Sequence, residues 1–324
     1  MKKFVAILLT LMLVLGIGAA VAEETYSDVR SVTVKKVYKL TNANMSSPAE
    51  TFTLEQVGAG RVTDGDATSA PALGTITGAI FAKGAATVDG TTGNITIALP
   101  TYEKVGVYEY TLREVAGKTV GVAYYGKDIL LKVTVIEQGG KVRVAAVHTE
   151  SGEGDDTAKR DNFPNEYSAG DLNVTKTVAG NLGDQSKKFN FTVTFTKPDG
   201  KDVNSTITAT VAGVDATDFN IAWDDKGTYT YTFQLAHGQK ASFANLPYGV
   251  SYTVTEAAAD GYTTTKAGDS GTINAAEHPA AFTNTKEGSI DTGVTTENLP
   301  YVLLIGFVVL AGAALLIKRK AHNN

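Results

Sequence analysis

The sequence of 324 residues contains no cysteine. In an exported protein, this absence excludes disulfide bonds as the source of stability. It also excludes thiolate catalysis and thiolate metal sites. The four histidines are scattered, with no pair at the spacing of metal ligands, so we expect no metal and no other cofactor. The net charge of −5 comes without a basic stripe, which argues against nucleic acid as a partner.

The sequence also lacks long segments with the 3.6-residue period of a helix, except at its two ends. Residues 28–286 instead contain many short runs rich in Val, Thr, Tyr and Phe that alternate between apolar and polar, which is typical of strands. Strands are predicted at 32–38, 51–57, 95–99, 107–115, 129–136, 142–147, 172–178, 189–196, 206–211, 228–235 and 252–256. Turn signals separate them at Asp89-Gly90, Gly139-Gly140, Asp199-Gly200 and Asp260-Gly261. This pattern predicts an all-β protein built from immunoglobulin-like β-sandwiches.

The N-terminus has the features of a secretory signal peptide over residues 1–22. Two lysines precede an apolar stretch over 4–21, and small residues lead up to a cleavage site between Ala22 and Glu23. An N-terminal membrane anchor is the alternative. The signal peptide predicts that the rest of the chain, apart from its C-terminal segment, is outside the cell.

The C-terminal segment, residues 289–324, contains a second apolar stretch. Residues 299–317 carry no charge and are long enough to cross a bilayer, and the basic run 318–320 follows at once. Basic residues after a span hold that end in the cytoplasm. A transmembrane segment with the bulk of the chain outside is therefore predicted.

Just before this span the sequence reads Ser289-Ile290-Asp291-Thr292-Gly293. A Thr-Gly pair, a short spacer, an apolar span and a basic tail resemble the cell-wall sorting signal of Gram-positive bacteria. The resemblance implies that a sortase cleaves between Thr292 and Gly293 and passes the threonine carbonyl to an amine. Ser289 and Ile290 replace the Leu and Pro of the usual LPxTG motif. A permanent transmembrane anchor is the alternative.

A lysine, a glutamate and an asparagine occur in the same order twice, each in a predicted strand. The first set is Lys36, Glu114 and Asn165. Because side chains alternate between the two faces of a strand, Lys36 and not Lys35 shares the apolar face with Val34. A lysine in an amphipathic strand usually faces solvent, but two copies of the set on apolar faces argue against that interpretation.

The second set is Lys176, Glu256 and Asn284. The repeat divides the mature chain into two tandem immunoglobulin-like domains, 23–167 and 168–288. The link between them is very short, so we expect the domains to lie end to end with limited bending.

These three residue types are the reactants for an amide bond between lysine and asparagine. Burial among apolar groups lowers the pKa of a lysine, whose reference value is about 10.4, and keeps a carboxylic acid protonated. A protonated glutamate can donate a hydrogen bond to the asparagine carbonyl oxygen and relay protons while ammonia leaves. We expect the dry surroundings to come from Tyr110, Phe163, Tyr252 and Phe282. Such a reaction turns over once, so we expect no enzyme.

The segments around both sets of residues resemble the streptococcal pilin isopeptide-linkage domain of T-antigen-type major pilins. The similarity covers nearly the whole mature chain. In the second domain, Glu256 is followed by the pair Gly261-Tyr262, and the first domain has no such pair after Glu114. The resemblance implies a cell-surface pilus shaft in which identical subunits are joined head to tail by a pilin-type sortase. It further implies minor pilins and peptidoglycan as partners.

In that family the acceptor of the next subunit's threonine is a lysine shortly before the first asparagine. Lys159, in an acidic stretch, is the nearest match and is the expected acceptor. The alternative function is a wall-anchored adhesin that binds a host surface ligand and does not polymerise. A secreted enzyme would need a convergent polar cluster that the sequence does not contain.

Overall fold

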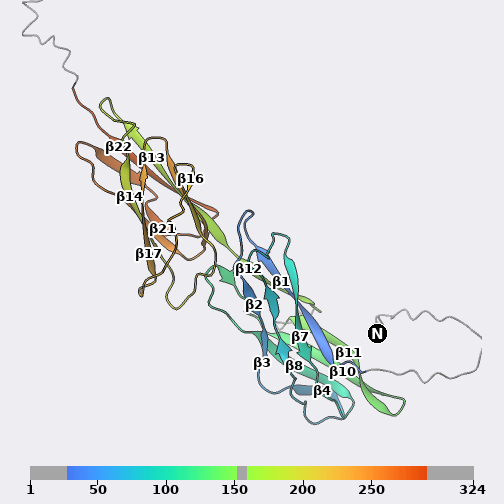
Figure 1. The fold of residues 1–324 in the computed structure, drawn as a ribbon. Helices are drawn as coiled ribbons and strands as arrows, with labels where there is room; N and C mark the ends of the chain where they lie inside the picture. Colours follow the sequence, from blue (N-terminus) through green and yellow to red (C-terminus); the bar gives the residue numbers. More distant parts are fainter. Residues whose placement is uncertain (1–27, 152–158, 290–324) are drawn as a thin grey trace, which may run out of the picture.

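The computed structural model describes residues 28–151 and 159–289, which form two β-sandwich units arranged end to end (Figure 1). This confirms the prediction of an all-β fold. Within the described ranges, no helix is long and apolar enough to cross a membrane. The predicted signal peptide with its Ala22–Glu23 cleavage site, the Thr292-Gly293 pair and the predicted C-terminal span all lie outside the described residues.

The first unit ends at Tyr167 and contains twelve strands. These are β1 (Ser31–Leu40), β2 (Glu50–Phe52), β3 (Leu54–Gln56), β4 (Arg61–Gly65), β5 (Ile76–Thr77), β6 (Ala79–Phe81), β7 (Thr91–Ala98), β8 (Gly106–Glu114), β9 (Val122–Ala123), β10 (Ile129–Gln138), β11 (Lys141–Ser151) and β12 (Asn162–Tyr167). One sheet has the order β5-β7-β1-β12-β9, and the other has β11-β10-β8-β3 with β4 also on β8. Strands β2 and β6 form a separate pair.

The second unit begins at Ala169 and contains ten strands. These are β13 (Ala169–Ala179), β14 (Phe189–Thr196), β15 (Thr208–Val211), β16 (Val214–Asp215), β17 (Thr228–Leu235), β18 (Lys240–Pro247), β19 (Ser251–Glu256), β20 (Thr263–Ala267), β21 (Ser270–Thr272) and β22 (Glu277–Thr285). Its sheets have the orders β16-β15-β18-β13-β22-β20 and β17-β14-β19-β21. Each unit has its own apolar core.

The first and last strands of each unit lie side by side and run parallel. Strand β1 pairs with β12, and β13 pairs with β22. The two pairs share one register, because Lys36 stands opposite Phe163 and Lys176 stands opposite Phe282. Each asparagine therefore lies two residues further along its strand, on the same face as the lysine.

Most predicted strands match the structure closely, but one run is divided and several strands, including β4, β18 and β20, were not predicted. The run predicted at 51–57 breaks at Thr53, and its halves join different partners, β2 with β6 and β3 with β8. Strand β18 was not predicted, although it pairs with both β13 and β15 in the centre of its sheet. Its residues Asn245 and Pro247 favour turns, which hides the alternation of buried Ala241 and Phe243.

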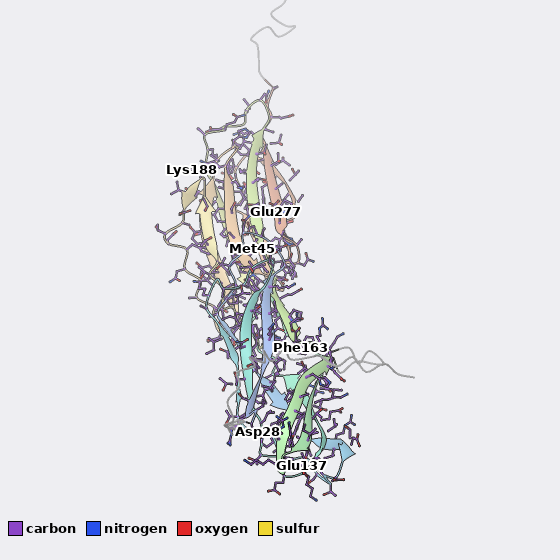
Figure 2. The ribbon with its side chains drawn as sticks, turned by 90° about the vertical axis from the view of Figure 1, so that its right-hand side faces the viewer. Asp28, Met45, Glu137, Phe163, Lys188 and Glu277 are labelled. Atoms are coloured by element: carbon purple, nitrogen blue, oxygen red, sulfur yellow. The ribbon has the colours of Figure 1, made fainter. Side chains whose placement is uncertain are left out.

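The two units meet through a single connecting residue, Ser168, and through side chains from both sides. Met45 lies in this region (Figure 2). The Asn42 Nδ2 donates hydrogen bonds to the Ala169 carbonyl at 2.7 Å and the Tyr248 hydroxyl at 3.0 Å. Val120 of the first unit is 5% exposed and packs into the core of the second. The junction is thus a packed contact as well as a covalent link.

Candidate crosslinking sites

The structure brings the first set of predicted residues together inside the first sandwich. Lys36 on β1, Glu114 at the end of β8 and Asn165 on β12 are 1%, 4% and 1% exposed. The Lys36 Nζ donates hydrogen bonds to Asn165 Oδ1 at 2.7 Å and to Glu114 Oε2. The Asn165 Nδ2 donates to Glu114 Oε1 at 2.5 Å. The three side chains therefore close a buried ring of contacts.

In the second sandwich the glutamate again bonds both the lysine and the asparagine, but no hydrogen bond among the described residues joins this lysine to this asparagine. The Lys176 Nζ lies 2.8 Å and 2.9 Å from the two carboxylate oxygens of Glu256, at the end of β19. The Asn284 Nδ2 on β22 donates to Glu256 Oε1 at 2.5 Å. Within the described part of the chain, the buried Asn284 Oδ1 accepts no hydrogen bond, so it is free to receive one as charge develops.

Burial prepares both lysines for nucleophilic attack. The pKa of Lys36 is lowered, because desolvation outweighs the opposing effect of Glu114. The pKa of Lys176 is lowered for the same reason, with Glu256 opposing. The neutral amine, which is the nucleophile, is therefore easier to form at both sites than on an exposed lysine.

The aromatic rings nearest the lysines differ from those expected. The Lys36 Nζ lies 5.3 Å from the centroid of the Phe52 ring and 5.7 Å from that of Tyr125. The Lys176 Nζ lies 4.3 Å from Phe189 and 5.8 Å from Phe191. The alternation of Phe189 and Phe191 on one face of a predicted strand could have indicated their role. No local sequence pattern could have predicted that the rings of Phe52 and Tyr125 lie near Lys36.

The four expected rings lie one layer away or face elsewhere. Phe163 packs edge-on against Tyr125, with centroids 5.2 Å apart, and Phe282 packs against Phe191 at the same distance. The hydroxyls of Tyr110 and Tyr252 donate to the backbone carbonyls of Pro71 and Gly268. The four predicted rings are thus buried, but the rings that lie over the two lysines are others.

The orientation of the two amides also differs from the expected one. Both glutamates accept a hydrogen bond from the amide nitrogen of the asparagine, where a contact with its oxygen was expected. The amide nitrogen is the atom that must leave as ammonia. Each carboxyl group thus lies between the amine that loses protons and the nitrogen that needs one, which is the geometry of a proton relay.

Lys159 is exposed and lies at an isolated bridge between its own backbone and that of Glu150. It lines a hollow of about 300 Å³ with residues that include Val32, His148 and Arg160. Its side chain is therefore accessible at the surface.

The described residues contain no group of three or more His, Asp or Glu side chains that could hold a metal ion.

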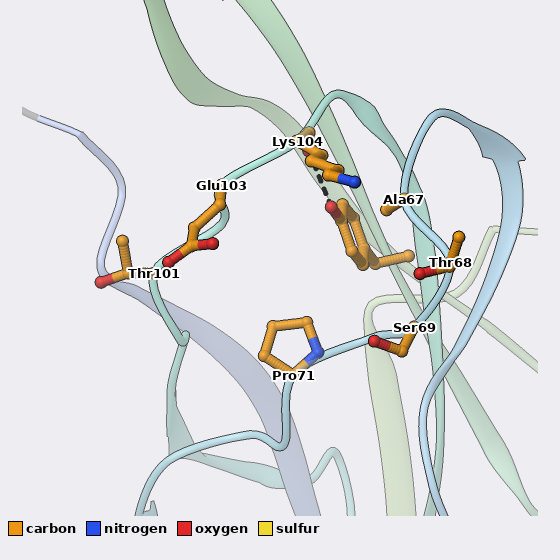
Figure 3. Close-up of a pocket in the computed structure, with 8 residues that line it drawn as sticks. Ala67, Thr68, Ser69, Pro71, Thr101, Glu103 and Lys104 are labelled. Atoms are coloured by element: carbon orange, nitrogen blue, oxygen red, sulfur yellow. Dashed lines mark hydrogen bonds between the residues drawn. The ribbon is translucent and has the colours of Figure 1, made fainter.

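Another hollow of the first unit, of about 330 Å³, offers no comparable chemistry (Figure 3). Its lining is mostly short side chains, with Glu103 and Lys104 as its charged members. The Tyr108 hydroxyl donates to the Lys104 carbonyl at 2.7 Å. None of the six lysine, glutamate and asparagine residues of the two sets lines this hollow.

Both units resemble known proteins. A family model described as a Spy0128-like isopeptide containing domain matches residues 32–168, and one described as a domain of unknown function matches residues 170–286. The chain is 31% identical over 246 residues to a protein named Pilin from Streptococcus pyogenes serotype M1, covering 68% of this chain and 69% of that protein. A crystal structure of the major pilin from Streptococcus pyogenes aligns with a TM-score of 0.54 and 25% identity, covering 81% of this chain and 100% of that one.

A more limited similarity links the chain to the pilus tip adhesin Cpa of Streptococcus pyogenes. The two are 29% identical over 133 residues, which is 39% of this chain but only 18% of the adhesin.

Proposed function

Because the chain belongs to the family of Gram-positive major pilins, as a structural subunit of a cell-surface pilus, we propose that it is the repeating unit of a covalent shaft. In this proposal each unit carries an autocatalytic crosslink, Lys36–Asn165 in the first and Lys176–Asn284 in the second. The observation that carries it is the pair of buried clusters of lysine, glutamate and asparagine with the same strand register.

The reaction proposed for the first unit starts with a proton passing from the Lys36 Nζ to Glu114. The neutral amine attacks the Asn165 Cγ, and a C–N bond forms while Nζ loses another proton. Glu114 delivers its first proton to Nδ2 and accepts the second proton from Nζ, the C–Nδ2 bond breaks, and the departing ammonia takes that second proton and leaves as ammonium. Across the reaction an ammonium and an amide become a new amide and an ammonium ion, so atoms and charge balance. Glu256 has the same role for Lys176 and Asn284. The protein is a single-turnover reactant and not an enzyme.

The first test is the intact mass of recombinant residues 23–288. We expect a mass lower than that of the sequence by two ammonia molecules. Replacement of Glu114 or Glu256 by alanine should restore one of them in each case, and peptide mapping should assign it to the matching unit. Replacement of the exposed Glu55 serves as the control and should change nothing. A wild-type mass equal to that of the sequence would refute both crosslinks.

We also propose that a pilin-type sortase joins Thr292 of one subunit to Lys159 of the next, with loss of the chain from Gly293 onward. The accessible Lys159 side chain supports this assignment. The signal peptide would direct export, and the span at 299–317 would hold the precursor in the membrane until the sortase acts. Minor pilins and peptidoglycan would be further partners.

Cell-wall extracts test this second proposal. The wild type should give a ladder of high-mass polymers, and Lys159→Ala should abolish it. Lys141→Ala, which removes another exposed lysine of the same unit, should leave the ladder intact. A ladder that persists in Lys159→Ala would refute the assignment of the acceptor. A wild type without any ladder would favour the alternative of an adhesin that binds a host surface ligand.

A further inference from the structure

The two crosslinking sites are covered in different ways. In the second unit, Phe189 and Phe191 near Lys176 both belong to the regular strand β14. In the first unit, one of the two rings near Lys36 belongs to Tyr125, which follows the two-residue strand β9 and lies in no strand itself. The first site therefore depends on how an irregular segment is held in place.

Tyr125 contacts the first site in three ways. Its ring lies over Lys36 and packs against Phe163, and its backbone N–H donates to Glu114 Oε1 at 3.4 Å. In the described chain, Glu256 of the second site accepts hydrogen bonds only from Lys176 and Asn284. The backbone contact to the acid is thus particular to the first unit.

The preceding residue, Tyr124, is held by a half-buried acid that the crosslinking chemistry does not use. The Tyr124 hydroxyl donates to Glu50 Oε2 at 3.3 Å and accepts from the Thr119 N–H at 3.4 Å. A Cβ atom on Gly117 would lie 2.3 Å from this hydroxyl, so only glycine leaves room for it there. Several independent contacts therefore fix the end of the Tyr124 side chain.

Strand β2 connects this anchor to the site. Glu50 and Phe52 lie two residues apart and so point to the same side of β2. The Phe52 ring lies near Lys36 and packs against the Tyr124 ring, with centroids 5.9 Å apart. Burial raises the pKa of Glu50, and Glu114 adds a smaller effect in the same direction. The two carboxyl groups are therefore close enough to influence each other.

We propose that Glu50 is a positioning residue for the Lys36–Asn165 crosslink, holding Tyr124 so that Tyr125 covers Lys36 and binds Glu114. This inference rests on the proposed crosslinking function. Without the anchor, the segment would move away from the site, water would reach Lys36 and Glu114 would lose a donor that orients it. Small misplacements of reacting groups cost large factors in rate. The second unit has no such dependence and serves as an internal reference.

The test follows both crosslinks in the full chain after a pulse of isotope-labelled lysine in a sortase-deficient Gram-positive host. Samples are quenched in acid and digested, and the two crosslinked peptides are quantified by mass spectrometry. We expect Glu50→Ala to slow the Lys36–Asn165 crosslink about 10-fold relative to the Lys176–Asn284 crosslink of the same molecules. Tyr124→Phe should do the same, and the double variant should be no slower, because the two residues act through one contact.

Two matched variants separate positioning from general stability. Glu50→Gln keeps an oxygen that accepts from Tyr124 and should stay within about threefold of the wild-type ratio. Glu55→Ala removes an exposed acid of the neighbouring strand and should have no effect. A third measurement compares the thermal unfolding of Glu50→Ala with its parent when both carry Asn165→Ala. A positioning role predicts a rate loss larger than the stability loss explains.

If both crosslinks formed and the ratio of their rates were unchanged in Glu50→Ala and Tyr124→Phe, the inference would be overturned. An equal slowing of both crosslinks would also overturn it, because the defect would then lie in export or folding. A wild type that forms neither crosslink would instead refute the proposed function and remove the reaction that Glu50 is inferred to assist.

Discussion

Each set of lysine, glutamate and asparagine places two ionisable side chains inside an apolar core. Removing two charges from water is costly, and their attraction rarely compensates in full. The proposed crosslink would remove this cost, because the lysine would become part of a neutral amide and the released ammonium ion would leave for the solvent. Burial therefore activates the lysine and also favours the product. The same reasoning explains why both units keep the lysine and glutamate side chains almost fully buried.

The shared proton predicts how crosslinking depends on pH. The reaction needs one proton between lysine and glutamate, since the amine must be neutral and the leaving nitrogen must be protonated. At low pH both groups hold protons, and at high pH neither does, so the rate should be bell-shaped. Because burial lowers the pKa values of Lys36 and Lys176, the alkaline limb should fall below the ordinary lysine value of 10.5.

This profile can be measured with chains released from ribosomes into urea, where they stay uncrosslinked, and then refolded by dilution into buffers of different pH. The appearance of each crosslinked peptide gives its rate. A chain carrying Asn284→Ala controls for assignment, because it should show only the crosslink of the first unit. A rate that rises steadily up to pH 10.5 would contradict the relay by the glutamate.

At the scale of the strands, the proposed crosslink would join the first strand of each unit to the last. Lys36 and Asn165 are 129 residues apart in sequence but lie on neighbouring parallel strands. A parallel pair of this kind is closed only by the whole intervening chain, so its ordering costs much conformational entropy. A covalent bond at this place restricts the unfolded chain and lets a pulling force pass from β1 to β12 directly.

We therefore expect Asn165→Ala to lower the free energy of unfolding of the first unit by about 5 kcal/mol, from the chain-entropy model for a closed loop of this length. Urea unfolding followed by tyrosine fluorescence and by protease resistance would measure it. Asn94→Ala, on the neighbouring strand β7, is the control and should change stability by less than about 1 kcal/mol. Equal midpoints for Asn165→Ala and wild type would contradict the prediction.

The strand scale also shows what could be read from the sequence. Alternation is a local property, and it correctly put Lys36, Glu114 and Asn165 on inward faces. The order of strands in each sheet is not local, so the rings of Phe52 and Tyr125 could not be assigned to the first site. The division of the predicted strand 51–57 into two also depends on non-local pairing, because its two halves pair with different strands.

Other differences arise from chemistry that the pattern does not encode. Strand β18 contains Asn245 and Pro247, whose turn preference is overridden by pairing on both sides. The orientation of the two asparagine amides is set by the positions of the acids and lysines around them. The sequence predicts the identity of these reacting groups but not which amide atom faces the acid.

At the scale of the whole molecule, side chains hold the two units together in addition to the chain. Asn245 has a φ of 63° and lies in the junction. Its Oδ1 accepts from the Ser46 N–H at 3.2 Å, and its Nδ2 donates to the Ser46 carbonyl at 3.0 Å. With Asn42 and Val120, it fixes one unit against the other. A shaft made of such subunits would bend little within each of them.

The last prediction follows from this junction. The variant Asn42→Ala/Asn245→Gly removes the side-chain bonds that these two asparagines make across it, and glycine accepts the positive φ without strain. Each unit should stay folded, because its core and its crosslink lie away from the change. The units should then reorient relative to each other. Residual dipolar couplings should give separate alignment tensors for the two units in the variant, but a single tensor in the wild type. Asn181→Ala removes a hydrogen bond to the Gly288 carbonyl outside the junction and should retain the single tensor. If the junction variant also kept one tensor, the rigidity would come from the contacts that remain, which are the packing of Val120, the backbone bridge between Thr119 and Asp202, and the short link.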